Sequence, residues 1–161
     1  MLREITFEEI KPLWELLWPG RDDIAAMSSL THEGDDVWED TDMSIYDKYE
    51  PIFFGVYTDD TNELVAVNSC HPTSETRMRS RGLYVKLGYT GKGIAQGLLH
   101  HTVNYSRDNG FKVVWSLPRE KAIKTYTSAG FEIIGETRYG ETWPSSGVMQ
   151  YGTNYYVEKK L

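Results

Sequence analysis

Apolar residues recur along the chain with two different periods, and the change of period marks the expected elements. Short apolar or alternating runs are typical of β-strands. They predict strands at 2–5, 52–57, 64–71, 77–85, 112–116 and 131–137, with a further strand within 148–158. Apolar residues three and four positions apart predict helices at 6–18, 93–109 and 118–129, with short helices at 24–30 and 43–49.

Capping residues and helix breakers support these boundaries. Thr6 is followed three residues later by Glu9, which is the capping-box pattern at the start of a helix. Pro19-Gly20 ends that helix, and Pro118 suits the first turn of the last one.

The order of the elements predicts an α/β (α+β) fold with a mixed, mostly antiparallel central sheet of about six or seven strands, flanked by helices. The strands over 52–85 follow one another closely, as in an antiparallel meander. The helix at 93–109 connects the strand at 77–85 to the one at 112–116 through one parallel crossover. The turn before this helix therefore lies at the carboxyl end of a strand, where ligand clefts form in α/β sheets.

Length and composition fit one domain. A chain of 161 residues, 40% of them hydrophobic, can bury a core without disulfides or a metal, so a single domain over residues 1–161 is expected. No apolar run approaches the roughly 20 residues that span a bilayer, and the charged pair Arg3-Glu4 is unlike a signal peptide. The single cysteine, Cys70, excludes an intrachain disulfide and a cysteine-rich zinc site. We expect a cytoplasmic protein without a membrane partner.

The formal net charge is −7, and it is unevenly distributed. Residues 1–75 contain 18 acidic and 4 basic residues, whereas residues 76–124 contain 10 basic and 2 acidic ones. The basic segment includes the glycine-rich turn after residue 85, which favours an anionic ligand there. Two solvated surfaces of opposite charge explain much of the same pattern. The overall acidity argues against nucleic acid as a partner.

The turn Thr90-Gly91-Lys92-Gly93-Ile94-Ala95 carries the clearest chemical signal. Backbone N–H groups in such a turn are uncovered by side chains and point with the positive end of the following helix dipole, so they suit a diphosphate. A Walker P-loop requires Ser or Thr after the Gly-Lys pair, where Gly93 stands. A dinucleotide fingerprint requires glycine where Gln96 stands, which makes that interpretation weak.

Two segments together resemble the GNAT superfamily of N-acetyltransferases. The stretch from Thr90 to Leu99 is similar to its R/Q-x-x-G-x-G/A signature. Downstream, Ala122-Ile123-x-x-Tyr126-x-x-x-Gly130-Phe131 is similar to the family's A-I-x-L-Y-x-x-x-G-F segment. The resemblance is specific over about 83–135. It implies the acyl-CoA N-acyltransferase fold and metal-free transfer of an acetyl group from acetyl-CoA to a primary amine, by direct nucleophilic attack.

The resemblance also implies roles for the matching positions. Backbone amides of the turn would hold the coenzyme diphosphate, and the end of the preceding strand would orient the thioester. The implied cofactor-binding residues are Tyr84, Val85, Thr90, Gly91, Lys92, Gly93, Ile94, Ala95 and Arg119. Tyr126 is implied as the general acid for the leaving thiolate, because a phenol is protonated at neutral pH. The position of Tyr126 on an apolar helix face fits a packing residue as well.

Two positions depart from the family pattern. Thr90 stands where the family usually has Arg or Gln, and Arg119 stands where it often has Asn. Thr90 removes a long donor near the diphosphate, while Lys92 and Arg119 add positive charge. A non-catalytic acyl-CoA-binding or sensing domain with the same fold is the alternative that these departures leave open.

The sequence leaves the general base and the acceptor open. His71, Glu75 and the acidic residues over 33–47 are the candidates for a base, directly or through water. The arginines at 77, 79 and 81 suit an anionic group on the acceptor, or else a solvated sheet face. The acidic stretch instead suits a cationic amine.

A long loop with Tyr139, Trp143 and Pro144 is expected between the last two strands. Its aromatic side chains either form a wall of the acceptor pocket or mediate contact in a homodimer. The acceptor itself is expected to be the amine of a small molecule or a peptide.

Overall fold

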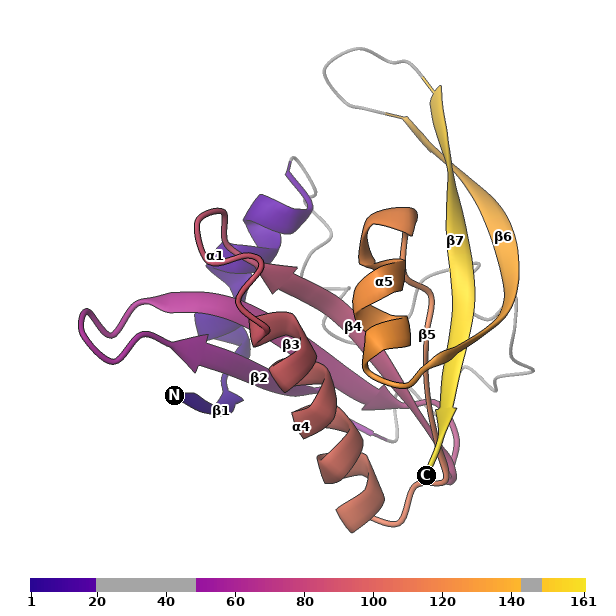
Figure 1. The fold of residues 1–161 in the computed structure, drawn as a ribbon, viewed down its shortest axis with the longest axis horizontal. Coiled ribbons are helices and arrows are strands. Elements are labelled where there is room, and N and C mark those ends of the chain that lie inside the picture. The colour runs from indigo at the N-terminus through magenta and orange to yellow at the C-terminus, as the bar shows by residue number, and fades with distance from the viewer. Residues whose placement is uncertain (20–48, 143–148) are drawn as a thin grey trace.

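The computed structural model describes residues 1–19, 49–142 and 149–161, and over 136–142 and 149–154 it describes the backbone alone. In these residues a seven-stranded sheet has the order β1-β2-β3-β4-β5-β7-β6 (Figure 1). The strands are β1 (Leu2–Ile5), β2 (Ile52–Tyr57), β3 (Leu64–Pro72), β4 (Arg77–Val85), β5 (Val113–Ser116), β6 (Glu132–Thr142) and β7 (Met149–Lys160). The helices are α1 (Phe7–Leu17), α4 (Ile94–Asp108) and α5 (Glu120–Ser128).

Neighbouring strands of this sheet pair antiparallel, except for β4 and β5, which pair in parallel. Helix α4 makes the crossover between that parallel pair. The predicted mixed, mostly antiparallel sheet with one parallel crossover is therefore confirmed. Within the described part of the chain, no helix is both long enough and apolar enough to cross a bilayer.

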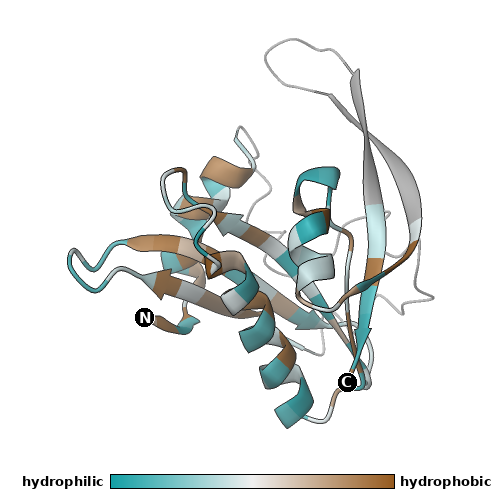
Figure 2. Ribbon diagram, in the orientation of Figure 1, coloured by the Kyte–Doolittle hydropathy of each residue, from teal (hydrophilic) through white to brown (hydrophobic). Residues whose placement is uncertain are grey.

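Helices cover both faces of the sheet. On one face, Leu98 of α4 and Tyr126 of α5 belong to the same buried cluster as Phe54 of β2. On the other face, Trp14 of α1 packs with Phe53, the strand neighbour of Phe54. Figure 2 shows brown and teal turns alternating along α4, as expected for a helix with one apolar face on the sheet.

The last two strands are longer than the sequence predicts. β6 continues to Thr142, which pairs with Met149 at the start of β7. Tyr139 therefore lies in β6, and its placement in a loop was wrong. Gly140 and the charged residues beside it break the apolar pattern, but backbone ladder bonds need no apolar side chain. The predicted helix at 24–30, the acidic stretch and Trp143-Pro144 lie outside the described residues, as does nearly all of 43–49.

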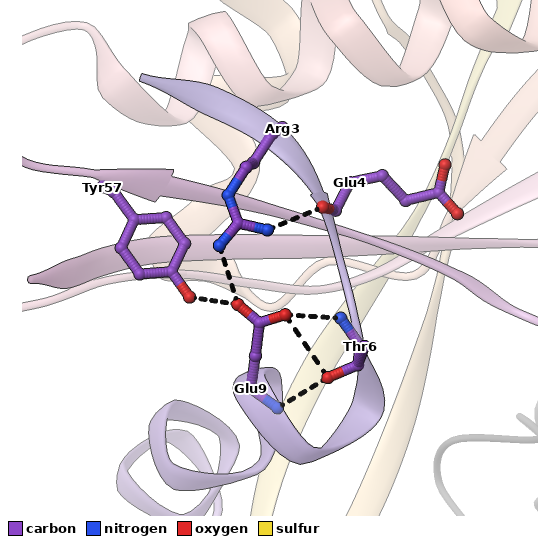
Figure 3. Close-up of polar contacts among 5 residues, drawn as sticks. All are labelled: Arg3, Glu4, Thr6, Glu9 and Tyr57. Atoms are coloured by element: carbon purple, nitrogen blue, oxygen red, sulfur yellow. Dashed lines mark hydrogen bonds and ion pairs between the residues drawn. The ribbon is translucent and has the colours of Figure 1, made fainter. Parts of the chain in front are cut away.

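A cluster of polar side chains holds the start of α1 (Figure 3). Thr6 Oγ1 accepts a hydrogen bond from the Glu9 N–H at 3.2 Å, and the Thr6 N–H donates to the Glu9 carboxylate at 3.3 Å, so the predicted capping box is confirmed. Arg3 of β1 donates to the same carboxylate at 3.0 Å, and the Tyr57 hydroxyl of β2 donates to it as well. Glu9 therefore ties α1 to two strands.

Glu9→Gln is expected to lower the Tm at pH 7, because it removes the charge that these donors share. Hydrogen bonds from Tyr57 and from the Thr6 backbone hold the pKa of the Glu9 carboxyl below its usual value. A lowered pKa stabilises the fold above the ordinary Glu pKa of about 4.3, and this stabilisation is lost as the pH falls through the folded-state pKa. The difference in Tm between parent and variant should therefore shrink below about pH 4.

Thermal unfolding followed by circular dichroism at pH 7 and in acid measures this effect. Glu8→Gln, in the same exposed helical turn, is the matched control and should change the Tm little. Equal losses of Tm in both variants, independent of pH, would contradict the role of the Glu9 cluster.

Candidate active site

β4 and β5 separate after a short parallel contact. They pair at Arg77↔Val113, Met78↔Val114 and Arg79↔Trp115. β4 then continues to Val85, whereas β5 ends at Ser116, and Figure 1 shows the two strands diverging. Among the described residues, β4 beyond Arg79 has β3 on one side and no paired strand on the other. We call the opening between residues 80–85 of β4 and the end of β5 the fork.

Three hydroxyl groups meet at the closed end of the fork. Ser116 Oγ donates to the Ser80 carbonyl oxygen at 2.6 Å, which joins the two strands where their ladder stops. Tyr126 of α5 places its hydroxyl oxygen 3.0 Å from Ser80 Oγ and 3.1 Å from Ser116 Oγ. All three residues are buried. The ring of Tyr126 also packs edge-on against Phe131, so the residue combines a packing role with a polar group directed at the strands.

The Tyr126 hydroxyl is protonated at neutral pH. Burial raises the pKa of this phenol above its ordinary value near 10, while hydrogen bonds from Ser116 and Ser80 and the charge of Arg79 oppose that rise. A buried phenol that keeps its proton can act as an acid toward a stronger base formed beside it.

A β-bulge bends β4 within the fork. The register of β3 against β4 shifts between Val67 and Ser69, so that one residue of β3 faces two of β4. Gly82, in the bulge, has a φ of 75°, and its carbonyl accepts a hydrogen bond from Trp14 Nε1 at 3.1 Å. A Cβ at Gly82 would lie 2.6 Å from that nitrogen. Backbone conformation and close approach of the α1 indole both require glycine here.

Gly82→Ala is expected to destabilise the protein by more than about 2 kcal/mol, because it adds a steric clash to the cost of a positive φ. Gly110→Ala is the control: Gly110 has a φ of 85°, but a Cβ there would meet nothing within 4 Å. Urea denaturation should show a clearly larger loss of unfolding free energy for Gly82→Ala than for Gly110→Ala. Equal losses would show that the Trp14 contact adds nothing.

Backbone groups near the end of β4 are directed toward the fork. The Lys86 N–H donates to the Val65 carbonyl at 2.8 Å, and Val85 pairs with Ala66. In an antiparallel ladder this arrangement turns the N–H and C=O of Val85 away from β3 and toward the fork. The main-chain groups of Tyr84 then face β3. The two residues were expected to act alike, but the ladder gives them different orientations.

The glycine turn leaves the N-terminus of α4 without a side-chain cap. Gly93 is the N-cap, with a φ of 77°, and within the described residues no side chain caps it and no acidic residue lies in the first turn. The N–H groups of Ile94, Ala95 and Gln96, which precede the first intrahelical bond from Gly97 to Gly93, therefore keep hydrogen-bonding capacity at the positive end of the helix dipole. A Cβ at Gly91 or Gly93 would meet nothing within 4 Å, so the space in front of these amides is open.

Contacts with the residue preceding β3 hold the side chains of the turn. Lys86 Nζ lies 2.5 Å from the Glu63 carboxylate, and the Tyr89 hydroxyl donates to the same carboxylate at 3.4 Å. The Lys92 ammonium lies 5.6 Å from the centre of the Tyr89 ring. Thr90 and Lys92 are both exposed, so a short hydroxyl and a cation stand at the surface of the turn.

Arg119 is the N-cap of α5, where its side chain makes no capping hydrogen bond. A guanidinium has no acceptor, so it cannot cap helix amides as an asparagine can. The residue is exposed and directly follows Pro118, whose carbonyl accepts a hydrogen bond from the Tyr155 N–H of β7 at 2.8 Å. A positive charge therefore stands where the chain leaves β5 for α5.

Of the candidate bases, the acidic residues over 33–47 lie outside the described residues, and neither His71 nor Glu75 lies at the fork. His71 is fully buried, with Nε2 2.6 Å from the Tyr49 carbonyl oxygen, and burial lowers the pKa of its imidazole. His71 pairs across the strands with Arg79, one residue before Ser80, and therefore lies on the opposite face of the sheet from Ser80. Glu75 is exposed in the turn before β4, at the other end of the strand from the fork.

Cys70 is also unsuited to a chemical role, because it is fully buried and burial raises the pKa of its thiol. In the part of the chain that the structure describes, no three His, Cys, Asp or Glu side chains gather in a group that could hold a metal ion.

The three arginines of β4 have different surroundings. Arg77 donates to the hydroxyl of Tyr156 and lies 3.5 Å from the Glu158 carboxylate. Arg79 is buried, with its guanidinium 5.1 Å from the centre of the Trp115 ring. Arg81 lies over an aromatic ring at the end of α1. These residues therefore do not form the solvated face that was one interpretation of their alternation.

Sequence reasoning missed Ser80, Ser116 and Gly82. A glycine inside a strand is a signal of a bulge or a close backbone approach, so Gly82 was within reach. Nothing in the local pattern marks the two serines, because their meeting depends on the parallel pairing of two strands.

Comparison with known proteins identifies the family and the fold. The model of the acetyltransferase (GNAT) family matches residues 10–131, which confirms the resemblance of the two motifs. A comparison with curated proteins returned no match.

Solved structures with the same fold include three acetyltransferases. An IAA acetyltransferase from Bacillus cereus is 14% identical with a TM-score of 0.69, covering 100% of this chain and 99% of that one. A GNAT family acetyltransferase from Elizabethkingia anophelis with acetyl-CoA bound is 13% identical with a TM-score of 0.68, covering 100% and 97%. An aminoglycoside 6'-N-acetyltransferase from Enterococcus faecium is 14% identical with a TM-score of 0.65, covering 99% and 96%. Because the family model matches most of the chain, the chain belongs to the GNAT family of acetyltransferases.

Proposed function

We propose that this protein transfers an acetyl group from acetyl-CoA to the primary amine of a small molecule or peptide, by direct attack within a single domain. The observation that carries this proposal is the Tyr126 hydroxyl at the closed end of the fork, beside Ser80 and Ser116. A thioester whose thiol arm lies along β4, past Val85, would reach this acid at the closed end of the fork.

The coenzyme is a co-substrate, and the glycine turn is its binding site. The diphosphate accepts hydrogen bonds from backbone N–H groups between Thr90 and Ala95, where the helix dipole is positive and the space is open. Lys92 and Arg119 supply positive charge that offsets the missing long donor at position 90. The open space in front of Gly91 and Gly93 supports this assignment, since an added side chain would occupy it.

Chemistry at the fork needs no acyl-enzyme. The amine nitrogen forms a bond to the thioester carbonyl carbon, and a backbone N–H of β4 that faces the fork close to Tyr126 donates to the oxygen that becomes negative. When the carbon–sulfur bond breaks, the electron pair leaves on sulfur and Tyr126 donates its proton to the thiolate. The attacking amine releases one proton to solvent, and the Tyr126 phenolate takes one back. The products are an amide and the free coenzyme thiol.

The acceptor is an amine, as in the aminoglycoside acetyltransferase that shares this fold. The buried Arg79 makes a simple anion-binding face less favourable than the sequence pattern suggested. A panel that includes polyamines, aminoglycosides, amino acids and peptides with free amino groups covers both charge classes.

Incubation of the protein with acetyl-CoA and each amine, followed by mass spectrometry, tests the proposal. An acetylated product that carries one added acetyl group, with release of an equal amount of coenzyme thiol, supports the enzyme. Tight coenzyme binding without product across the panel favours a non-catalytic acyl-CoA-binding domain instead.

A further inference from the structure

A buried polar network crosses the apolar core beside the fork. It contains Asn68 of β3, Ser80 of β4, Thr102 of α4, Ser116 of β5 and Tyr126 of α5, each at most 4% exposed. Apolar side chains surround it, including Met78, Leu98 and Val114. Polar groups in such a place cost free energy unless their hydrogen bonds are satisfied, so the network needs a structural or a chemical reason.

The end of the network that lies farthest from the fork is fixed to α4. Asn68 Nδ2 donates to Thr102 Oγ1 at 3.0 Å, and Thr102 Oγ1 donates to the Leu98 carbonyl at 2.9 Å. The same amide nitrogen lies 3.0 Å from Ser80 Oγ. The Ser80 hydroxyl has two possible acceptors for its proton, the Tyr126 hydroxyl oxygen at 3.0 Å and Asn68 Oδ1 at 3.3 Å. When the Asn68 amide nitrogen donates to Ser80 Oγ, the Ser80 proton can go to the closer of these, Tyr126.

The number of available protons also fixes the hydrogen-bond directions at Ser116 and Tyr126. Ser116 has one hydroxyl proton and two partners, the Ser80 carbonyl at 2.6 Å and the Tyr126 hydroxyl at 3.1 Å. The carbonyl oxygen can only accept. While Ser116 donates its proton to this carbonyl, Tyr126 is therefore the donor in the longer contact, from its hydroxyl to Ser116 Oγ. If the phenol loses its proton, the Ser116 hydroxyl can turn to the phenolate. The phenolate would then accept hydrogen bonds from both serines.

We infer that Ser80 and Ser116 are positioning residues that hold the Tyr126 hydroxyl at the closed end of the fork and stabilise its phenolate form. This inference rests on the proposed function, in which Tyr126 is the acid. Asn68 holds the Ser80 hydroxyl in place through its amide nitrogen, and a phenolate is a stronger acceptor for the Ser80 proton than Asn68 Oδ1. Burial disfavours a negative charge on the Tyr126 oxygen, and hydrogen bonds from the two serines offset part of this cost. The positive charge of Arg79 favours the phenolate in the same way.

Replacement of Tyr126 by 3,5-difluorotyrosine tests the inference directly, because this phenol titrates at lower pH and reports its ionisation through ¹⁹F NMR. In that protein, Ser80→Ala and Ser116→Ala should each raise the pKa of the fluorinated phenol. In the enzyme with an ordinary Tyr126, each should lower kcat roughly five- to tenfold, the effect of one lost hydrogen bond, with an unchanged KM for acetyl-CoA.

Ser106→Ala is the matched control. Ser106 is buried in α4 and donates to the Thr102 backbone at 2.7 Å without touching Tyr126. It should move neither the titration nor kcat. Ser116→Thr, which keeps a hydroxyl, should restore both values if the hydroxyl is the cause.

A phenol pKa that is the same in all four serine variants and the parent would overturn the inference. Failure of the proposed function has a different signature. Full turnover in Tyr126→Phe would reject the acid, while the ¹⁹F titration would still show whether the serines act on the phenol.

Discussion

Tyr126→Phe is expected to lower kcat about 100-fold or more while the Kd for coenzyme A changes little. The variant keeps the ring that packs on Phe131 and removes only the hydroxyl that reaches Ser80 and Ser116. General acid catalysis is worth about 10²–10⁴ in rate, so its loss should dominate kcat. Thiol release with the best acceptor from the amine screen measures kcat, and isothermal titration calorimetry measures coenzyme binding.

Tyr105→Phe is the control for this change. Tyr105 is a partly buried tyrosine of α4 that packs on Phe54 with ring centroids 5.5 Å apart. Its replacement should leave kcat near the parent value. Turnover of Tyr126→Phe equal to that of Tyr105→Phe would remove Tyr126 from the chemistry and leave it as a packing residue.

Gly93→Val is expected to weaken coenzyme A binding about 10- to 100-fold. Hydrogen bonds to a charged group contribute about 1.5–3 kcal/mol each, and the new side chain would both fill the space in front of the α4 amides and disturb the turn that aims them. A Cβ at Gly93 would meet nothing within 4 Å, so the loss of affinity would not come from a clash inside the fold. It would come from a clash with the coenzyme and from the changed backbone of the turn. The measurement is the Kd of coenzyme A by calorimetry.

Gly110→Val separates binding from stability. Gly110 shares the positive φ and the open surroundings of Gly93 but follows the C-terminal end of the same helix. Both variants should lose similar unfolding free energy, since both force a β-branched residue into the left-handed region. An equal rise in Kd for Gly93→Val and Gly110→Val would show that general destabilisation, and not the change in the turn, weakens coenzyme binding.

Local chemistry explains why the sequence marks the proposed coenzyme site more clearly than the fork. A strand end, a glycine turn and a helix start are consecutive in the chain, so Thr90 to Ala95 could be interpreted without knowledge of the fold. The fork depends on where β4 and β5 stop pairing, and Ser80 and Ser116 are 36 residues apart. A serine inside a strand carries no pattern that tells whether its neighbour across the sheet is a strand or an opening.

The β6–β7 hairpin and His71 show two further limits of sequence patterns. The polar and glycine residues after Thr137 led to a predicted strand that is too short. The strand continues because hairpin pairing is stabilised by backbone hydrogen bonds, which any residue except proline can make. His71 suggested a base because histidine titrates near neutral pH, but burial and the contact with the Tyr49 carbonyl depend on packing that a strand pattern cannot show. Both errors arise from tertiary structure and not from local propensity.

The most direct test compares coenzyme A with pantetheine, which has the same thiol arm without the diphosphate, by calorimetry on the unmodified protein. If the amides at the start of α4 hold the diphosphate, coenzyme A should bind with one-to-one stoichiometry and pantetheine at least tenfold more weakly. Absence of measurable heat with coenzyme A, or equal affinity for the two compounds, would contradict the coenzyme site and with it the assignment of the fork.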